Sequence, residues 1–195
     1  MKNFKWGTES FNDKPIHVVL FVSRNKDNKN LSNFKERRRS FITHKTIEEL
    51  EEDFSAFVGE GVIGEFCRMY YSVNERDGDK IYKELMHFLF DNPDFNLCSL
   101  GSKLAGIAAK KECAKTKRWM FDFDSTNLDD LHAFIQDLRK YYNSEEYETH
   151  STPHGFAIIT EHGFDTRELL TKWKDVVTLK RDDLFCADWM VEGEE

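Results

Sequence analysis

The sequence predicts an α+β protein, with a mixed, mainly antiparallel sheet and helices packed largely on one face. Apolar runs of strand character alternate with amphipathic helical segments, without the regular rhythm of repeated β-α-β units. Only three prolines and ten glycines occur in 195 residues, which indicates short connections. Glycine-rich phosphate loops of the dinucleotide-binding and Walker types are absent.

The individual elements follow from local patterns. A capping box, Thr46 with Glu49, opens one helix, and Asn127 caps another. We expect helices over residues 46–57, 77–90, 102–111, 127–142 and 166–173. We expect strands over residues 16–22, 66–73, 118–123 and 155–160, with two short strands between 176 and 190.

Length and composition predict one domain spanning residues 1–195. Hydrophobic residues make up 39% of the chain, which is enough for a core. The polar segment 25–39 is expected to form a flexible exposed loop or a short polar helix, and residues 191–195 a frayed acidic end. The net charge of -8 excludes nucleic-acid binding through a bulk field, so such binding needs a local basic patch or bridging metal ions.

The expected compartment is the cytoplasm. The four cysteines lack paired or zinc-finger spacing, so free thiols are expected. No signal sequence precedes the first strand, and no apolar run approaches the length of a membrane span. We therefore expect a protein without a membrane partner.

Asp122 and Asp124 form the leading candidate site. Residues two apart in a strand point to the same face, so both carboxylates share one face while Phe121 and Phe123 enter the core. Adjacent carboxylates repel, burying either is costly, and a hard divalent cation removes both penalties. Alternatively, Asp124 stands at the end of the strand only to cap the helix that follows. That alternative gives no reason for a carboxylate at Asp122.

Hydroxyl, imidazole and cationic side chains supply candidate phosphate contacts. Ser151, Thr152 and His154 stand at the mouth of a strand, although an ordinary solvated loop gives the same pattern. Arg68 lies on a strand, where burial demands a partner, which makes it a candidate phosphate clamp. Two lysines seven residues apart, Lys103 and Lys110, share a helix face that either steers phosphates or is merely solvated.

A third carboxylate is expected late in the chain. Asp188 lies between an apolar run and Trp189, so a strand could hold it, whereas Asp182 and Asp183 are typical of a turn.

These motifs occur in the order found in the archaeo-eukaryotic primase superfamily, which includes replicative primase catalytic subunits and primase-polymerases. The chain resembles a small, divergent member of that superfamily over residues 68–188. The resemblance rests on Met120 to Asp124, on Ser151, Thr152 and His154, and on Ala187 with Asp188. It implies an RNA-recognition-fold-like core, Mg²⁺ or Mn²⁺ on Asp122, Asp124 and Asp188, and His154 on a nucleotide phosphate.

Many members carry a strand histidine where this chain has Ala157. Either His154 replaces that histidine from the loop, or nucleotide binding has been lost. The first function hypothesis is a metal-dependent nucleotidyltransferase acting on nucleic acid and nucleoside triphosphates, as in DNA replication. A catalytically degenerate binding or inhibitor protein with a protein partner, such as a phage product, is the alternative. A metal-dependent nuclease or phosphodiesterase ranks last.

Overall fold

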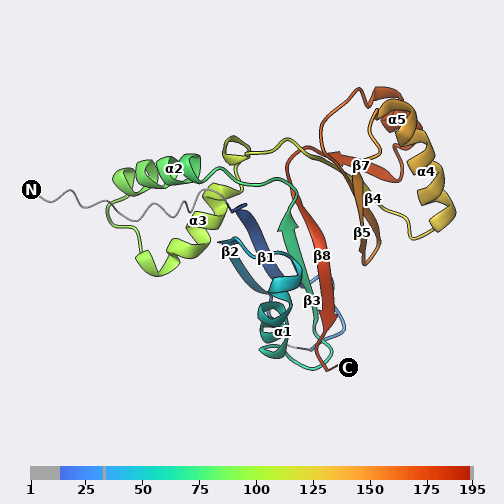
Figure 1. Ribbon diagram of the computed structural model, residues 1–195. Coiled ribbons are helices and arrows are strands. Elements are labelled where there is room, and N and C mark those ends of the chain that lie inside the picture. The colour runs from blue at the N-terminus through green and yellow to red at the C-terminus, as the bar shows by residue number, and fades with distance from the viewer. Residues whose placement is uncertain (1–13, 33, 194–195) are drawn as a thin grey trace, which may run out of the picture.

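The computed structural model describes residues 14–32 and 34–193. It contains two four-stranded sheets in which every pairing is antiparallel. The predicted α+β class is confirmed, although the strands form two sheets side by side instead of one (Figure 1).

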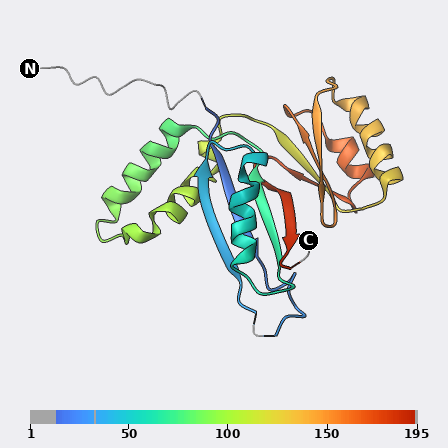
Figure 2. The same cartoon turned by 60° about the horizontal axis from the view of Figure 1, so that its bottom comes forward.

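The first sheet has the strand order β2-β1-β3-β8. Its strands are β1 (His17–Ser23), β2 (Arg37–Thr43), β3 (Phe66–Ser72) and β8 (Leu184–Val191). A short 3-10 turn (Glu48–Leu50) leads into α1 (Glu51–Gly59), which lies across one face of this sheet (Figure 2). Phe54 and Phe57 of α1 are buried against Phe21 and Met69 of the sheet.

A helical hairpin packs against the β2 side of the first sheet (Figure 1). It contains α2 (Gly78–Asp91), α3 (Leu100–Ala108) and the 3-10 turns Leu97–Ser99 and Lys111–Cys113. Asp77 caps α2 by accepting from the backbone N–H groups of Asp79 and Lys80. Ile81, Ala105 and Ile107 form a separate buried cluster with Val18 of β1.

The second sheet has the strand order β5-β6-β4-β7. Its elements are β4 (Trp119–Phe123), α4 (Leu128–Tyr141), β5 (Tyr147–Thr152), β6 (Gly155–Thr160), α5 (Arg167–Lys172) and β7 (Val177–Lys180). This is the β-α-β-β-α-β order of ferredoxin-like folds, and both helices lie on the outer face of the sheet (Figure 1). A four-stranded sheet of this kind agrees with the expected RNA-recognition-fold-like core.

The alternation of side chains along β4 divides the second sheet into two faces. Phe121 and Phe123 pack beneath α4 and α5 with Phe134. On the other face, Met120 joins the core cluster of the first sheet. The two sheets therefore share a core, and Asp122 lies on the side that faces the first sheet.

Three regions differ from the sequence prediction. Residues 24–32 and 34–36 form a loop that leads into β2, and Asn28 anchors it because its buried side-chain amide donates to Ser23 Oγ and to two backbone carbonyls. Strand β5 occupies residues expected to be a polar turn. Strand β8 runs through Val191, and Glu192 exchanges backbone hydrogen bonds with segment 64–65, so the chain is paired where fraying was expected. Residues 194–195 lie outside the described residues.

All four cysteines are free thiols, as expected. Within the described residues, no helix has the length and apolar character needed to cross a bilayer.

A buried carboxylate ties α4 to α5. Asp137 accepts hydrogen bonds from Lys140, Lys172 and Trp173 Nε1, the last at 3.0 Å. Hydrogen bonds from Lys140 and Lys172 hold the pKa of Asp137 far below its usual range. They outweigh the burial of the carboxyl, which acts to raise the pKa. The stabilisation is therefore complete above the unfolded-state pKa of the carboxyl and is lost as the pH falls.

Replacing Asp137 with alanine is expected to lower the free energy of unfolding by roughly 2 kcal/mol at neutral pH, because charge-assisted bonds are lost. The difference from wild type should shrink on acidification, when the carboxyl of Asp137 is protonated. Urea denaturation followed by circular dichroism at several pH values measures both effects. A difference that is independent of pH would contradict the assigned role of the charge.

Candidate functional site

A pocket between the two sheets contains the aspartate pair. Asp122 stands on β4 opposite Ala157 of β6 on one side and Thr178 of β7 on the other, and Asp124 follows at the end of the strand. The pocket has a volume of about 360 Å³ and draws its walls from both sheets. Its size falls within the range of small-ligand sites, so one nucleotide or a comparable ligand could enter.

The two carboxylates lack protein partners. Within residues 14–32 and 34–193, neither side chain accepts a hydrogen bond or forms an ion pair within 4 Å. Burial raises the pKa of Asp122, the negative charge of Asp124 adds to that rise, and the charge of Lys180 opposes it. A partly buried, unpaired carboxylate beside a second one is costly, which is the condition that a bound cation relieves.

Arg68 brings the first sheet into the site. Its guanidinium forms a two-point contact with Asp27, from Nε at 2.9 Å and from Nη2 at 2.8 Å. Arg24 also binds Asp27 at 2.8 Å. Burial acts to raise the pKa of Asp27, but hydrogen bonds from both arginines outweigh it and lower the pKa. Arg68 is therefore rigidly held, with much of its charge already neutralised.

His154 lies in the turn between β5 and β6 and contacts Arg68. The distance from Arg68 Nη2 to His154 Nε2 is 3.3 Å. A guanidinium can only donate, so Arg68 is the donor in this contact. Thr152 and His154 both line the pocket with the aspartates, so the structure brings together two segments that the sequence only suggested were neighbours.

The pocket is cationic on an acidic protein. Four basic side chains and two acidic ones line it, whereas the whole chain carries a net charge of -8. The basic residues are Arg24, Lys26, Arg68 and Lys180. This local excess supplies the basic patch that phosphate binding requires, and it comes from different segments than the lysine-rich helix proposed from the sequence.

Asp188 does not join the aspartate pair. It lies on β8 opposite Met69, and its carboxylate accepts the backbone N–H of Trp189 at 2.8 Å. Burial raises the pKa of Asp188, the Trp189 hydrogen bond opposes the rise, and the charge of Glu51 on α1 adds to it. The bulge between Met69 and Tyr70 of β3 sets the face of β8 on which each residue lies. Among late aspartates, Asp183 is the one whose charge reaches Asp122.

Three other candidates also lie outside the pocket. Ser151 is exposed on β5, and strand alternation directs it away from Thr152 to the opposite face. The ammonium of Lys103 rests 3.6 Å from the ring centroid of Phe88, and that of Lys110 binds Glu84 at 2.9 Å. Both lysines belong to the α2–α3 hairpin, across the first sheet from the aspartate pair (Figure 1).

Sequence reasoning missed Arg24, Lys26 and Lys180. Arg24 and Lys26 follow directly after the buried strand β1, and Lys180 ends β7. Charged residues immediately after a strand are often placed at a sheet edge where sites form, and this signal could have singled them out. The sequence does not show that the end of β1 and the end of β7 both line the pocket of Asp122, because that depends on how the two sheets pack.

The donor set fits a metal that binds together with its substrate. No group of three or more potential metal-ligating side chains occurs in the part of the chain that the structure describes. Magnesium is commonly held by one or two carboxylates, with waters and substrate phosphates completing the octahedron. Asp122 and Asp124 supply these two carboxylates. A structural metal site that is closed to substrate would need more protein ligands.

Comparisons of the chain with models of known protein families, with curated proteins and with solved structures gave no significant match.

Proposed function

We propose that this protein is a metal-dependent nucleotidyltransferase, whose pocket binds a nucleoside triphosphate with Mg²⁺ or Mn²⁺ and acts on nucleic acid. The single observation that carries the proposal is an unpartnered carboxylate pair in a pocket with four cationic side chains. Carboxylates select the hard cation, and the cations select the phosphates. The order of motifs shared with primase-like proteins supports the same reaction class.

Each side chain has a defined part in this proposal. Asp122 and Asp124 hold the divalent ion, which supplies charge stabilisation at the phosphoryl oxygens when it is bound. Arg24 and Lys180 bind the triphosphate, with the half-buried Asp27 fixing the position of Arg24. His154 contacts Arg68 and lines the same pocket, where it would meet the nucleotide.

Isothermal titration tests the proposal directly. A non-hydrolysable nucleoside triphosphate with Mn²⁺ is expected to bind wild type, and Asp122→Asn should weaken this binding at least about tenfold, because a metal ligand is lost. Asp130→Asn, on the exposed face of α4, is the matched control and should bind like wild type. Incorporation of a labelled nucleotide into an oligonucleotide then reports transfer.

The absence of heat with wild type, or equal heat with Asp122→Asn, would overturn the proposal. Cleavage of nucleic acid in the absence of triphosphate would favour a nuclease that uses the same carboxylates on water.

A second candidate is a binding protein on a primase-like fold without catalysis. Two observations favour it, namely Ala157 opposite Asp122, in place of a strand histidine, and the pairing of Arg68 with Asp27. Such a protein would act on a protein partner and would not need the metal. Biological activity that survives the Asp122→Asn/Asp124→Asn double substitution would support this candidate over the enzyme.

A further inference from the structure

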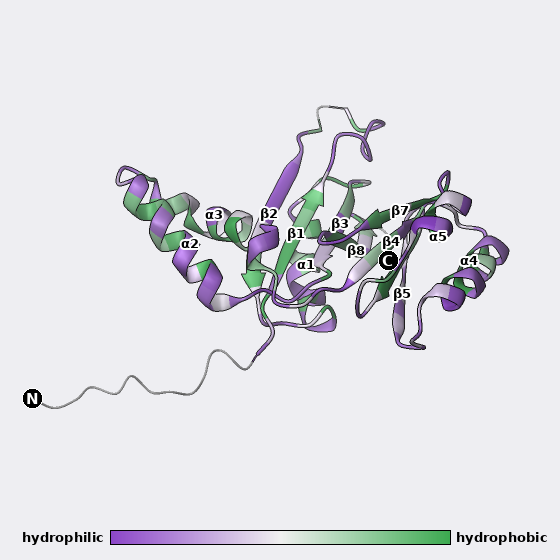
Figure 3. Ribbon diagram, turned by 90° about the horizontal axis from the view of Figure 1, so that it is seen from above, coloured by the Kyte–Doolittle hydropathy of each residue, from purple (hydrophilic) through white to green (hydrophobic). Residues whose placement is uncertain are grey.

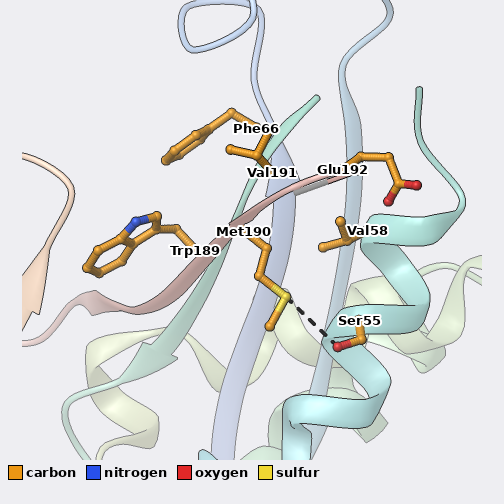
Figure 4. A pocket seen from close by; sticks show the side chains of 8 residues that line it. Ser55, Val58, Phe66, Trp189, Met190, Val191 and Glu192 are labelled. Carbon is orange, nitrogen blue, oxygen red and sulfur yellow. Dashed lines mark hydrogen bonds between the residues drawn. The ribbon is translucent and has the colours of Figure 1, made fainter. Parts of the chain in front are cut away.

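Two aromatic side chains form a shelf next to the candidate pocket. The aromatic shelf consists of Phe66 on β3 and Trp189 on β8. Trp189 stands directly opposite Arg68, and Phe66 opposite Val191, so strand alternation places all four on one face of the β3–β8 pair. Figure 4 shows the rings of Phe66 and Trp189 extending from the same side of the strands, while Met190 turns toward Ser55 of α1.

The aromatic shelf is continuous with the candidate pocket. A second hollow, of about 430 Å³, is bounded by the shelf, by Asp27 and by the turn between β5 and β6. Four residues line both hollows, namely Lys26, Arg68, Thr152 and His154. A ligand that enters at the aspartates therefore meets the shelf after passing Arg68 and His154.

The shelf has the composition of a stacking platform. Phe66 and Trp189 are each half-buried, so part of each side chain is accessible to a ligand. The Arg68 guanidinium lies 5.1 Å from the Phe66 ring centroid and adds a cationic edge. Lys26 is exposed at the rim and forms no ion pair within the described segments, so its charge is available to a ligand.

Aromatic rings beside cationic side chains are the chemistry that recognises single-stranded nucleic acid, because unpaired bases expose their faces and their phosphates follow at regular spacing. A duplex hides the base faces within its stack, and an acidic peptide lacks extended π surfaces. The half-buried aromatic pair, together with its continuity with the pocket, favours the single strand over both.

We propose that the groove over Phe66 and Trp189 binds single-stranded nucleic acid, with a base stacked on Trp189 and a neighbouring phosphate on Lys26. The inference rests on the proposed function in one respect, because it identifies the nucleic-acid strand on which the aspartate site acts. The strand crosses Arg68 and His154 on its way to the metal site.

Fluorescence anisotropy of a labelled oligothymidylate, without metal or triphosphate, tests this placement. Trp189→Ala is expected to weaken binding about tenfold or more, and Trp189→Phe should restore most of it, since stacking needs only an aromatic face. Tyr82→Ala, an exposed aromatic on α2, is the matched control and should bind as wild type does. Lys26→Ala should lower the salt dependence by about one phosphate contact.

Several outcomes would overturn the inference. The first is that the oligothymidylate binds wild type no better than background. The second is that a duplex binds as tightly as the single strand. The third is that Trp189→Ala and Lys26→Ala both bind the oligothymidylate with wild-type affinity. Lys26 is exposed, so its variant keeps the test decisive if Trp189→Ala does not fold. The Asp122→Asn variant should still bind the oligonucleotide at wild-type affinity. Loss of triphosphate binding therefore tests the metal site, and loss of oligonucleotide binding tests the aromatic shelf.

Discussion

Replacing Gly155 with alanine is expected to destabilise the protein by about 3 kcal/mol, at the upper end of the cost of overpacking a core. Gly155 is buried at the start of β6, where an added Cβ would lie 1.9 Å from the carbonyl oxygen of Phe123 and 3.0 Å from the backbone nitrogen of Ser125. Both neighbours are backbone atoms, so no side chain can rotate away. The β4 end and the β5–β6 turn would have to separate, which would move Asp124 and His154 as well.

Gly106→Ala is the matched control, because no atom lies within 4 Å of its added Cβ in α3. That substitution should stabilise the protein by roughly 0.5–1 kcal/mol through helix propensity. Urea denaturation measures both variants, and Gly155→Ala should also lose triphosphate binding. A Gly155→Ala protein as stable as wild type would show that β4 and β6 are farther apart than described.

The second large effect concerns the metal. Mn²⁺ at about 100 times its dissociation constant is expected to raise the free energy of unfolding by about 2.7 kcal/mol, since it binds only the folded chain. For a chain of this length that corresponds to a rise of about 5–10 °C in the melting temperature. Asp122→Asn should cut the rise to about half or less, because at least tenfold weaker binding leaves about 1.4 kcal/mol at the same Mn²⁺ concentration. The Asp130→Asn control should retain the full rise. An equal rise in all three proteins would place the metal elsewhere.

The same carboxylate sets a pH dependence. Because burial and Asp124 raise the pKa of Asp122, the folded chain holds this proton to higher pH than the unfolded chain does. Without metal, protonation of Asp122 therefore raises the free energy of unfolding as the pH falls through the folded-state pKa. At neutral pH the ionised carboxylate of Asp122 lowers the free energy of unfolding. Metal-free Asp122→Asn should thus melt above wild type at neutral pH. The metal-induced rise should weaken on acidification, because protons compete for the carboxylate.

Apolar periodicity predicted most of the fold. Strands β1, β3, β4 and β6 and helices α2 and α4 follow the patterns of their sequences, and the predicted caps at Thr46 and Asn127 form the expected bonds. The missed strands, β2 and β5, are both edge strands. Edge strands carry polar and charged residues, and the polar character of β2 is visible in Figure 3, so neither showed an apolar run.

The candidate site divides in a similar way. Strand alternation correctly placed Asp122 on the face opposite Phe121, and Arg68 and His154 line the same pocket as Asp122. Asp188 lies on a strand, as expected, but it does not line the pocket with Asp122 and Asp124, because a bulge in the β3–β8 pairing changes which residues of β8 share a face. A bulge of this kind depends on pairing between distant segments, which periodicity within one segment does not encode.

The position of β8 in the chain has a consequence for biosynthesis. The second sheet is built from one continuous segment, β4 to β7, whereas the first sheet places β8 beside β3 with that whole segment between them. During translation the continuous unit can fold as soon as it leaves the ribosome, while β3 keeps an open edge until β8 emerges. The pairing of Trp189 with Arg68 is therefore completed after Asp122 is in place on β4, so the nascent chain presents the carboxylate before it has the groove.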